Sequence, residues 1–225
     1  MNMYADSHLH MTDPNYKGAD ERAGLLFTCA ASPDEWARIS SIDVGRVRKF
    51  YGTHPWYLDR YSENDLEELL ETDSAANVGE IGLDSKHGSL DDQVGPFEEQ
   101  LILSKRYDRI ANIHMIGCES EMLKILRRHK TTAIIHSFSG PESYIGPLTE
   151  CDCYFSVSPR ILNRSADKIR SLILKIPEER LLIETDAPNS RIGMDQHIAK
   201  LSEILSMEPE ELEHLTFRNA SSLLP

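Results

Sequence analysis

Histidines and carboxylates stand at the ends of short apolar segments in this sequence. Five of its nine histidines lie at or just past the carboxyl end of such a segment, and two carboxylates lie in similar places. These residues are His8, His10, His54, His114, His136, Glu80 and Asp186. Imidazole and carboxylate ligands suit zinc, manganese, nickel or iron better than magnesium or calcium. All but His54 form a set of six, more than one tetrahedral site needs, so the pattern predicts two divalent metal ions.

The segment Asp6-Ser7-His8-Leu9-His10 carries the most specific part of this pattern. Alternate residues of a strand point to the same face, so His8 and His10 are expected to converge on one metal. Asp6 is expected to lie deeper on that face and to orient a metal-bound histidine. Glu80 has two carboxylate oxygens and a central position, which makes it the natural bridge between two metals. An isolated histidine at a strand end is more often a packing or capping residue, and only the coincidence of all six favours a metal site.

Eight short apolar runs are expected to be strands that position these residues. They cover 3–8, 24–30, 47–52, 77–83, 109–114, 132–136, 152–156 and 181–186. Stretches with apolar residues at helical spacing separate or follow them, at 32–41, 62–72, 93–106, 120–129, 166–174 and 209–224. Alternating strands and helices predict parallel pairing through right-handed crossovers. Eight units favour a TIM-type (β/α)₈ barrel over an open doubly wound sheet, and active sites of such barrels lie at the carboxyl ends of the strands.

Length and composition are those of an ordinary globular protein. The 225 residues are expected to form a single domain spanning 1–225. No apolar run approaches the roughly 20 residues needed to cross a bilayer, and the start carries no export signal, so the expected location is the cytoplasm. The four cysteines are expected to be reduced thiols. Nothing in the sequence points to an obligate protein partner or to a membrane.

The net charge of −13 constrains the substrate. Proteins that bind long nucleic acids usually present a basic face. Here the acidic residues concentrate at 63–71, 91–99 and 208–213, which are typical of solvated helix faces. A short or single-stranded DNA end, or a small phosphoester, therefore fits better than an extended duplex.

With these motifs the chain resembles the TatD-type metal-dependent hydrolases, a deoxyribonuclease-like branch of the amidohydrolase barrels. The resemblance extends over nearly the whole chain, with Asn219 in the closing helix also fitting it. It rests on Asp6-x-His8-x-His10, Gly52-Thr53-His54-Pro55, Gly79-Glu80-Ile81-Gly82-Leu83-Asp84, Gln93-x₃-Phe97-x₂-Gln100-Leu101, Ile113-His114, Ile135-His136-Ser137-Phe138-Ser139-Gly140 and Leu181-Leu182-Ile183-Glu184-Thr185-Asp186-Ala187-Pro188.

The resemblance implies a division of the ligands and a reaction. One metal would be held by His8, His10, Glu80 and Asp186, and the second by Glu80 together with His114 and His136. The implied reaction is hydrolysis of phosphodiesters in DNA, commonly as a 3′ exonuclease. Family members usually place an arginine two residues after the fifth-strand histidine, where this chain has Ile116. That departure, like the acidic charge, moves the prediction away from extended DNA.

The expected mechanism uses a water activated by the two metals, with Glu80 as the bridge. Asp186 is expected to take the water proton and pass it to the leaving oxygen. His54 is a candidate to contact the substrate, with a structural loop histidine as the alternative. Arg160 and Asn189 are weaker candidates for the same role.

Two alternatives belong to other functional classes. An amidohydrolase-type amide or lactone hydrolase acting on a small molecule would share the barrel, but many of those enzymes use a carboxylated lysine where this chain has Glu80. A catalytically silent metal-binding protein would be favoured by a missing ligand, and no ligand is missing.

Overall fold

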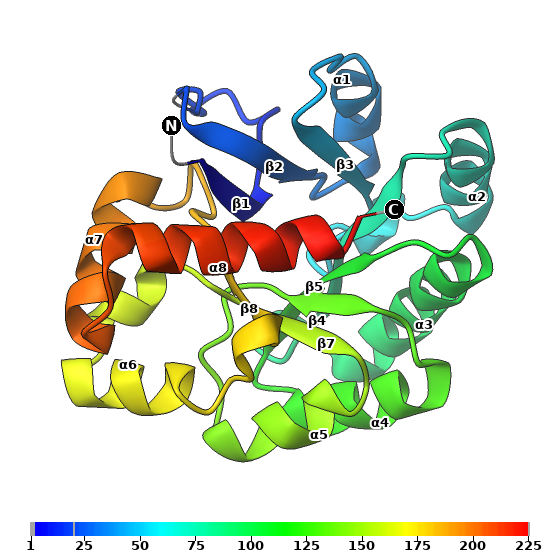
Figure 1. The fold of residues 1–225 in the computed structure, drawn as a ribbon. Coiled ribbons are helices and arrows are strands. Elements are labelled where there is room, and N and C mark those ends of the chain that lie inside the picture. The colour runs from blue at the N-terminus through cyan, green and yellow to red at the C-terminus, as the bar shows by residue number, and fades with distance from the viewer. Residues whose placement is uncertain (1–2, 20, 225) are drawn as a thin grey trace.

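The chain forms an eight-stranded parallel sheet that curls into a barrel (Figure 1). The computed structural model describes residues 3–19 and 21–224. Each strand pairs with the next along the chain, in the order β1 to β8. The strands are β1 (Tyr4–Leu9), β2 (Ala23–Cys29), β3 (Val47–Tyr51), β4 (Asn77–Asp84), β5 (Ala111–Ile116), β6 (Ala133–Ile135), β7 (Cys153–Val157) and β8 (Leu181–Ile183). The predicted barrel and all eight predicted strands are confirmed.

The first and last strands meet through backbone bonds beyond the end of β8. The His10 N–H donates to the Ala187 carbonyl at 2.8 Å, and the Asp186 N–H donates to the His8 carbonyl at 3.0 Å. Lower down, the Ser7 hydroxyl donates to the Ile183 carbonyl at 2.9 Å. We call this β1–β8 contact the seam of the barrel.

Helices surround the strands, and α8 lies across the barrel in the front of Figure 1. The helices are α1 (Trp36–Ser40), α2 (Glu63–Thr72), α3 (Leu90–Arg106), α4 (Glu119–His129), α5 (Ile145–Thr149), α6 (Ala166–Ile173), α7 (Met194–Leu205) and α8 (Pro209–Ser222). Short 3₁₀ helices are η1 (Pro33–Glu35), η2 (Leu58–Arg60), η3 (Glu142–Tyr144), η4 (Pro159–Asn163) and η5 (Glu178–Arg180). The six predicted helices are present, whereas α5 and α7 were not predicted. The Asn219 side chain fastens α8 to the barrel by donating to the Glu178 and Leu181 carbonyls.

The barrel interior changes from apolar to polar along each strand. Because alternate residues share a face, β8 and its extension direct Leu182, Glu184 and Asp186 inward in succession, while β6 and its end direct Ile134 and then His136. The apolar end packs against α8 through Ala220 in a cluster with Ala5, Leu25, Phe27, Cys29, Phe50, Ile110, Ile134 and Leu182. Polar side chains therefore collect at the carboxyl ends, opposite the end that α8 closes.

His197 in α7 is a buried histidine whose protonation links the stability of the fold to pH. Its side chain is fully buried, and its Nε2–H donates to the Val157 carbonyl at 2.9 Å, while Nδ1 has no hydrogen-bond partner among the described residues. Burial lowers its pKa from 6.5 to about 4. The unfolded chain thus binds a proton more readily between these two values, so His197 destabilises the fold as the pH falls through that window.

We expect acidification to pH 5 to cost the wild type about 2 kcal/mol more free energy of unfolding than it costs His197→Gln. Urea unfolding of both proteins at pH 7 and pH 5 measures the difference. Parallel losses in the two proteins would contradict the buried neutral imidazole.

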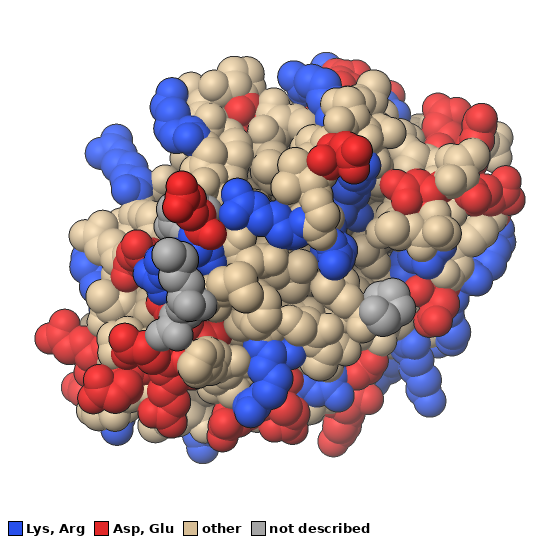
Figure 2. Space-filling model, turned by 45° about the horizontal axis from the view of Figure 1, so that its top comes forward, with Lys and Arg blue, Asp and Glu red and all other residues tan. Residues whose placement is uncertain are grey.

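Charges of both signs cover the face drawn in Figure 2. Basic and acidic side chains are interspersed there, and the described residues form no continuous basic tract on that face. All four cysteines are free and buried. Within the described ranges, no helix combines the length and the apolar character needed to cross a membrane. The single domain over 1–225, of which residues 1, 2, 20 and 225 lie outside the described part, and the cytoplasmic location both stay predictions.

Candidate metal centre

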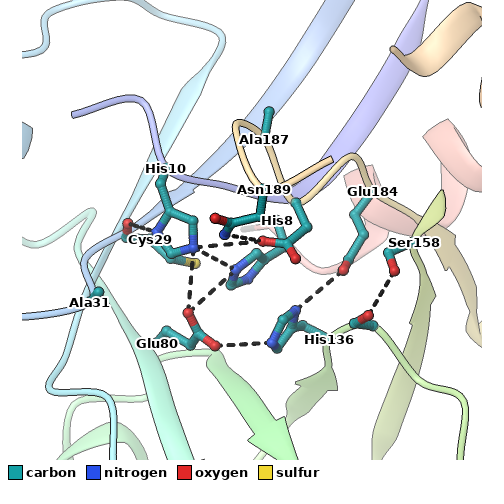
Figure 3. Close-up of polar contacts among 12 residues, drawn as sticks. His8, His10, Cys29, Ala31, Glu80, His136, Ser158, Glu184, Ala187 and Asn189 are labelled. Atoms are coloured by element: carbon teal, nitrogen blue, oxygen red, sulfur yellow. Dashed lines mark hydrogen bonds and ion pairs between the residues drawn. The ribbon is translucent and has the colours of Figure 1, made fainter. Parts of the chain in front are cut away.

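Glu80 lies at the centre of the polar end of the barrel, and its two carboxylate oxygens face different histidines (Figure 3). Its Oε2 is 3.5 Å from Nε2 of His8 and 3.5 Å from Nε2 of His10. Its Oε1 is 2.9 Å from Nε2 of His136 and 3.0 Å from Nδ1 of His114. The side chain is buried, with 4% of the residue exposed. One carboxylate thus presents a different oxygen to each pair of histidines, as a bridging ligand does, while ligand atoms of His8, Glu80 and His136 also lie within 4.8 Å of one another.

The first group spans the seam of the barrel. His8, His10 and Asp186 each direct one ligand atom into a space less than 4.8 Å across. The Nε2 atoms of the two histidines are 3.3 Å apart, and Asp186 Oδ1 is 3.8 Å from Nε2 of His10. β1 supplies His8, its continuation supplies His10, and the segment after β8 supplies the aspartate.

The second group lies on β5, at the end of β6 and in the loop after β3. Nδ1 of His114 and Nε2 of His136 are 3.3 Å apart. Nε2 of His54 is 3.4 Å from Glu80 Oε1, and its ring lies edge-on to that of His114 with centroids 4.3 Å apart. His54, predicted to contact substrate, therefore also offers a donor atom to this group, together with Glu80 and His114.

A close approach of β4 to β5 brings Glu80 to His114. Gly82 has a φ of +147°, and a Cβ there would lie 2.0 Å from the His114 carbonyl oxygen. Only glycine allows that backbone contact.

Two buried glutamines of α3 anchor the surrounding loops. The Gln100 amide exchanges hydrogen bonds with the Thr53 backbone, next to His54, and the Gln93 amide does the same with the Asp84 backbone. The glutamine motif of the sequence therefore acts by satisfying loop backbone groups that water does not reach.

Neighbouring side chains orient the histidine rings. Asn112 Oδ1 is 2.9 Å from Nδ1 of His8, and Glu184 Oε1 is 3.2 Å from Nδ1 of His136. Such contacts fix the ring orientation and the tautomer of a metal-binding histidine. Asp6, which was expected to orient a metal-bound histidine, contacts backbone and hydroxyl groups: its carboxylate accepts from the Thr185 N–H and hydroxyl at 2.9 and 2.6 Å and from the His8 N–H at 3.4 Å. Asn112 was not among the residues predicted for the site. Because Asn112 lies two residues before His114, strand alternation places both side chains on one face and could have identified it.

Asp186 is held by several contacts at the end of β8. Its φ of +52° lies in the left-handed region, which aspartate and asparagine tolerate better than most residues. The Asn189 amide donates to Oδ1 at 2.9 Å, and the Arg160 guanidinium is 3.3 Å from Oδ2. The two weaker candidates for substrate contact thus both contact Asp186 and line the same pocket.

The proximity of these groups sets their protonation. Burial opposes ionisation of Glu80, but His136, His54 and His8 hold its pKa well below the ordinary value. Burial lowers the pKa of His54 to about 3, so this imidazole is neutral and one of its two ring nitrogens is unprotonated. Burial together with His8 lowers the pKa of His10 in the same direction. Although burial opposes protonation of both rings, Cys29 and Glu80 raise the pKa of His8 well above its ordinary value, and Glu80 and Glu184 raise that of His136 to about 9. A cation that binds here must therefore displace protons from these two imidazoles, and imidazoles with an ionised carboxylate are a donor set that fits divalent metal ions.

A pocket of about 410 Å³ opens onto this donor set. Five carboxylates line it against two cationic side chains, Lys86 and Arg160. Ile116 is among the lining residues and brings an apolar side chain to the pocket.

The walls of the pocket include residues to which the sequence assigned no role. The Trp56 indole N–H donates to Asp84 Oδ2 at 2.8 Å, and the same oxygen is 3.3 Å from Nε2 of His114. His87 also lines the pocket. Asp84 lies four residues after Glu80 on the same strand, a spacing that places both side chains on one face.

Comparison with known proteins decides the family. The model of TatD related DNases matches residues 5–225. The chain belongs to the TatD related DNase family. The fold and the ordered motifs predicted this membership, which is confirmed.

Individual members show how far the similarity extends. The uncharacterized metal-dependent hydrolase YjjV of Escherichia coli K12 is 30% identical over 207 residues, which cover 83% of this chain and 80% of that protein. The crystal structure of that TatD homologue superimposes with a TM-score of 0.87 over 98% of this chain and 97% of the other, at 26% identity. The 3′-5′ ssDNA/RNA exonuclease TatD of Edwardsiella piscicida is 32% identical over 146 residues, 61% of this chain and 56% of that protein.

Membership of the TatD family makes the chain a metal-dependent hydrolase, as predicted. It favours the nuclease branch over the amide or lactone hydrolase. The number and identity of the metals and the roles of individual ligands stay predictions.

Proposed function

We propose that this protein binds two divalent cations, zinc most favourably, and hydrolyses phosphodiesters at the end of a short or single-stranded nucleic acid. The observation that carries the proposal is the position of Glu80, with one oxygen toward each group of donors. His8, His10 and Asp186 would hold one cation with Glu80. His114 and His136 would hold the other, and His54 either joins them or contacts the substrate.

The charge of the pocket supports the need for cations. Its five carboxylates exceed its two cationic side chains by three charges, so the pocket without metal repels a phosphate. Two divalent cations would reverse that balance. Bound there, they would lower the pKa of water and stabilise the charge that develops on the phosphoryl oxygens.

The chain's own residues would handle the proton and the substrate. Asp186 accepts a proton from the attacking water and returns it to the oxygen that leaves phosphorus, so the P–O bond breaks without a free alkoxide. The Asn189 amide and the Arg160 guanidinium hold that carboxylate in position. Arg160 is 60% exposed at the pocket and can exchange its ion pair for a phosphate oxygen.

The substrate class follows from the size and charge of the molecule. A pocket of about 410 Å³ falls within the range of small-ligand sites, which suits one chain end. The net charge of −13 disfavours a long duplex. The Edwardsiella relative that is named a 3′-5′ ssDNA/RNA exonuclease supports a strand end as the substrate.

The test combines metal analysis of the purified protein with a substrate panel. We expect about two metals per chain and cleavage of single-stranded DNA ends and of a bis-aryl phosphodiester. Chelation should abolish both activities, and added zinc or manganese should restore them. Cleavage confined to amide or lactone substrates would overturn the proposal.

A further inference from the structure

We propose that Trp56 is the stacking surface for the terminal nucleobase of the substrate strand, an inference that rests on the proposed function and names one of its specificity determinants. Trp56 follows the His54-Pro55 pair in the loop after β3 and lines the pocket. It is 49% exposed, whereas Trp36, the second tryptophan, is buried. A large indole left half-exposed beside a reaction centre is a surface that a ligand can cover.

The indole is held in a fixed orientation. Its N–H donates to Asp84 Oδ2 at 2.8 Å, and its backbone N–H donates to Nδ1 of His54 at 3.2 Å. The carboxylate of Asp84 also accepts from the Lys86 N–H at 2.9 Å. A ring that is oriented in advance loses little entropy when a base stacks on it.

The indole lies about one nucleoside away from the proposed metal ligands. Its ring centroid is 5.0 Å from that of His54 and 6.4 Å from that of His114, which both lie beside Glu80. A phosphodiester at the donor set would therefore place the base of an adjoining nucleotide near the indole. The His87 ring stacks on Trp56 at 5.4 Å with an interplanar angle of 30°, so a base would stack on the part of the indole that stays exposed.

Stacking on tryptophan is sequence-tolerant, because every base has a π-face. It would compensate for the scarcity of cations in this pocket, where Ile116 supplies none. Lys86 lines the same pocket, where its ammonium group would be available to a flanking phosphate. The proposal therefore predicts that the enzyme reads the presence of a terminal base and not its identity.

The decisive measurement is a ratio of kcat/KM values. A single strand with a normal terminal nucleotide is compared with one whose terminal sugar lacks the base. We expect Trp56→Leu to lower the ratio of base-bearing to abasic cleavage by about tenfold, the effect of losing one base–aromatic stack. Trp56→Phe keeps a ring but loses the bond to Asp84, and it should retain most of the ratio.

Two outcomes would overturn the inference. An unchanged ratio in Trp56→Leu would show that no base stacks there. An equal fall in Trp56→Leu and Trp56→Phe would assign the effect to the hydrogen bond with Asp84 instead of the ring.

A binding measurement separates this inference from the proposed function. Deoxyadenosine 5′-monophosphate should quench the indole fluorescence of the purified metalloprotein, whereas deoxyribose 5-phosphate should not, and Trp56→Leu should remove the quenching. Base-dependent quenching without phosphodiester cleavage would support the stacking surface and reject the nuclease. Phosphodiester cleavage with no quenching, and with an unchanged ratio of base-bearing to abasic cleavage in Trp56→Leu, would support the nuclease and reject the stacking surface.

Discussion

Glu80→Gln is expected to reduce the metal content from the proposed two ions per chain to one or none and to lower kcat/KM by about a thousandfold or more. An amide keeps the volume of the carboxylate but loses the charge and one of the two acceptor oxygens. Both donor groups then lack a shared anion, and the loss of about 4 kcal/mol of transition-state stabilisation corresponds to that factor. Metal analysis and steady-state kinetics on the bis-aryl phosphodiester measure the two effects.

Asp13→Asn is the matched control for this experiment. Asp13 lines the same pocket but belongs to neither donor group, and asparagine can still accept the Asn15 N–H bond that Asp13 Oδ1 accepts at 2.7 Å. This variant should keep its metals and most of its activity. Two tightly held metals in Glu80→Gln would rule out the bridging role.

Asp186→Asn is expected to keep the fold and some metal while losing turnover by about 10²–10⁴-fold, the usual contribution of a positioned proton acceptor. Asparagine tolerates the left-handed backbone at this position and can still accept from the Asn189 amide through its own oxygen. It does not take up a proton near neutral pH. Circular dichroism, metal analysis and kcat on a phosphodiester distinguish lost chemistry from lost structure.

Arg160→Gln tests the ion pair of Asp186 apart from its proposed role as a proton acceptor. It removes the contact with Asp186 Oδ2 but leaves the proton acceptor in place, so its effect on kcat should be much smaller than that of Asp186→Asn. Turnover close to wild type in Asp186→Asn would refute the proton-transfer role.

The barrel could be predicted because its strands are apolar, short and regularly spaced. The missed helices have separate causes. α5 has five residues and contains Gly146 and Pro147, so it shows little helical periodicity. In contrast, α7 does carry Met194, Ile198, Leu201 and Leu205 on one face, and its signal was present in the sequence.

The convergence of the six predicted ligands was predictable because strand ends of one barrel meet at one face. The surrounding contacts were less accessible. Asn112 reaches His8 from β5. The Asp6 carboxylate accepts hydrogen bonds from Thr185 and not from a histidine ring. The β1–β2 register shifts between Asp6 and Leu9. Pairings between residues more than a hundred positions apart depend on such local register, which strand alternation alone does not specify.

The seam of the barrel connects the proposed metal centre to the folding of the chain. The residues that close the cylinder, His8 and His10 at one margin of the sheet and Asp186 at the other, are also the donors proposed for one cation. An ion held there would link the first strand of the barrel to the segment that follows the last strand. Loading that ion would then be coupled to completion of the fold, and a partly closed barrel would be both metal-free and inactive.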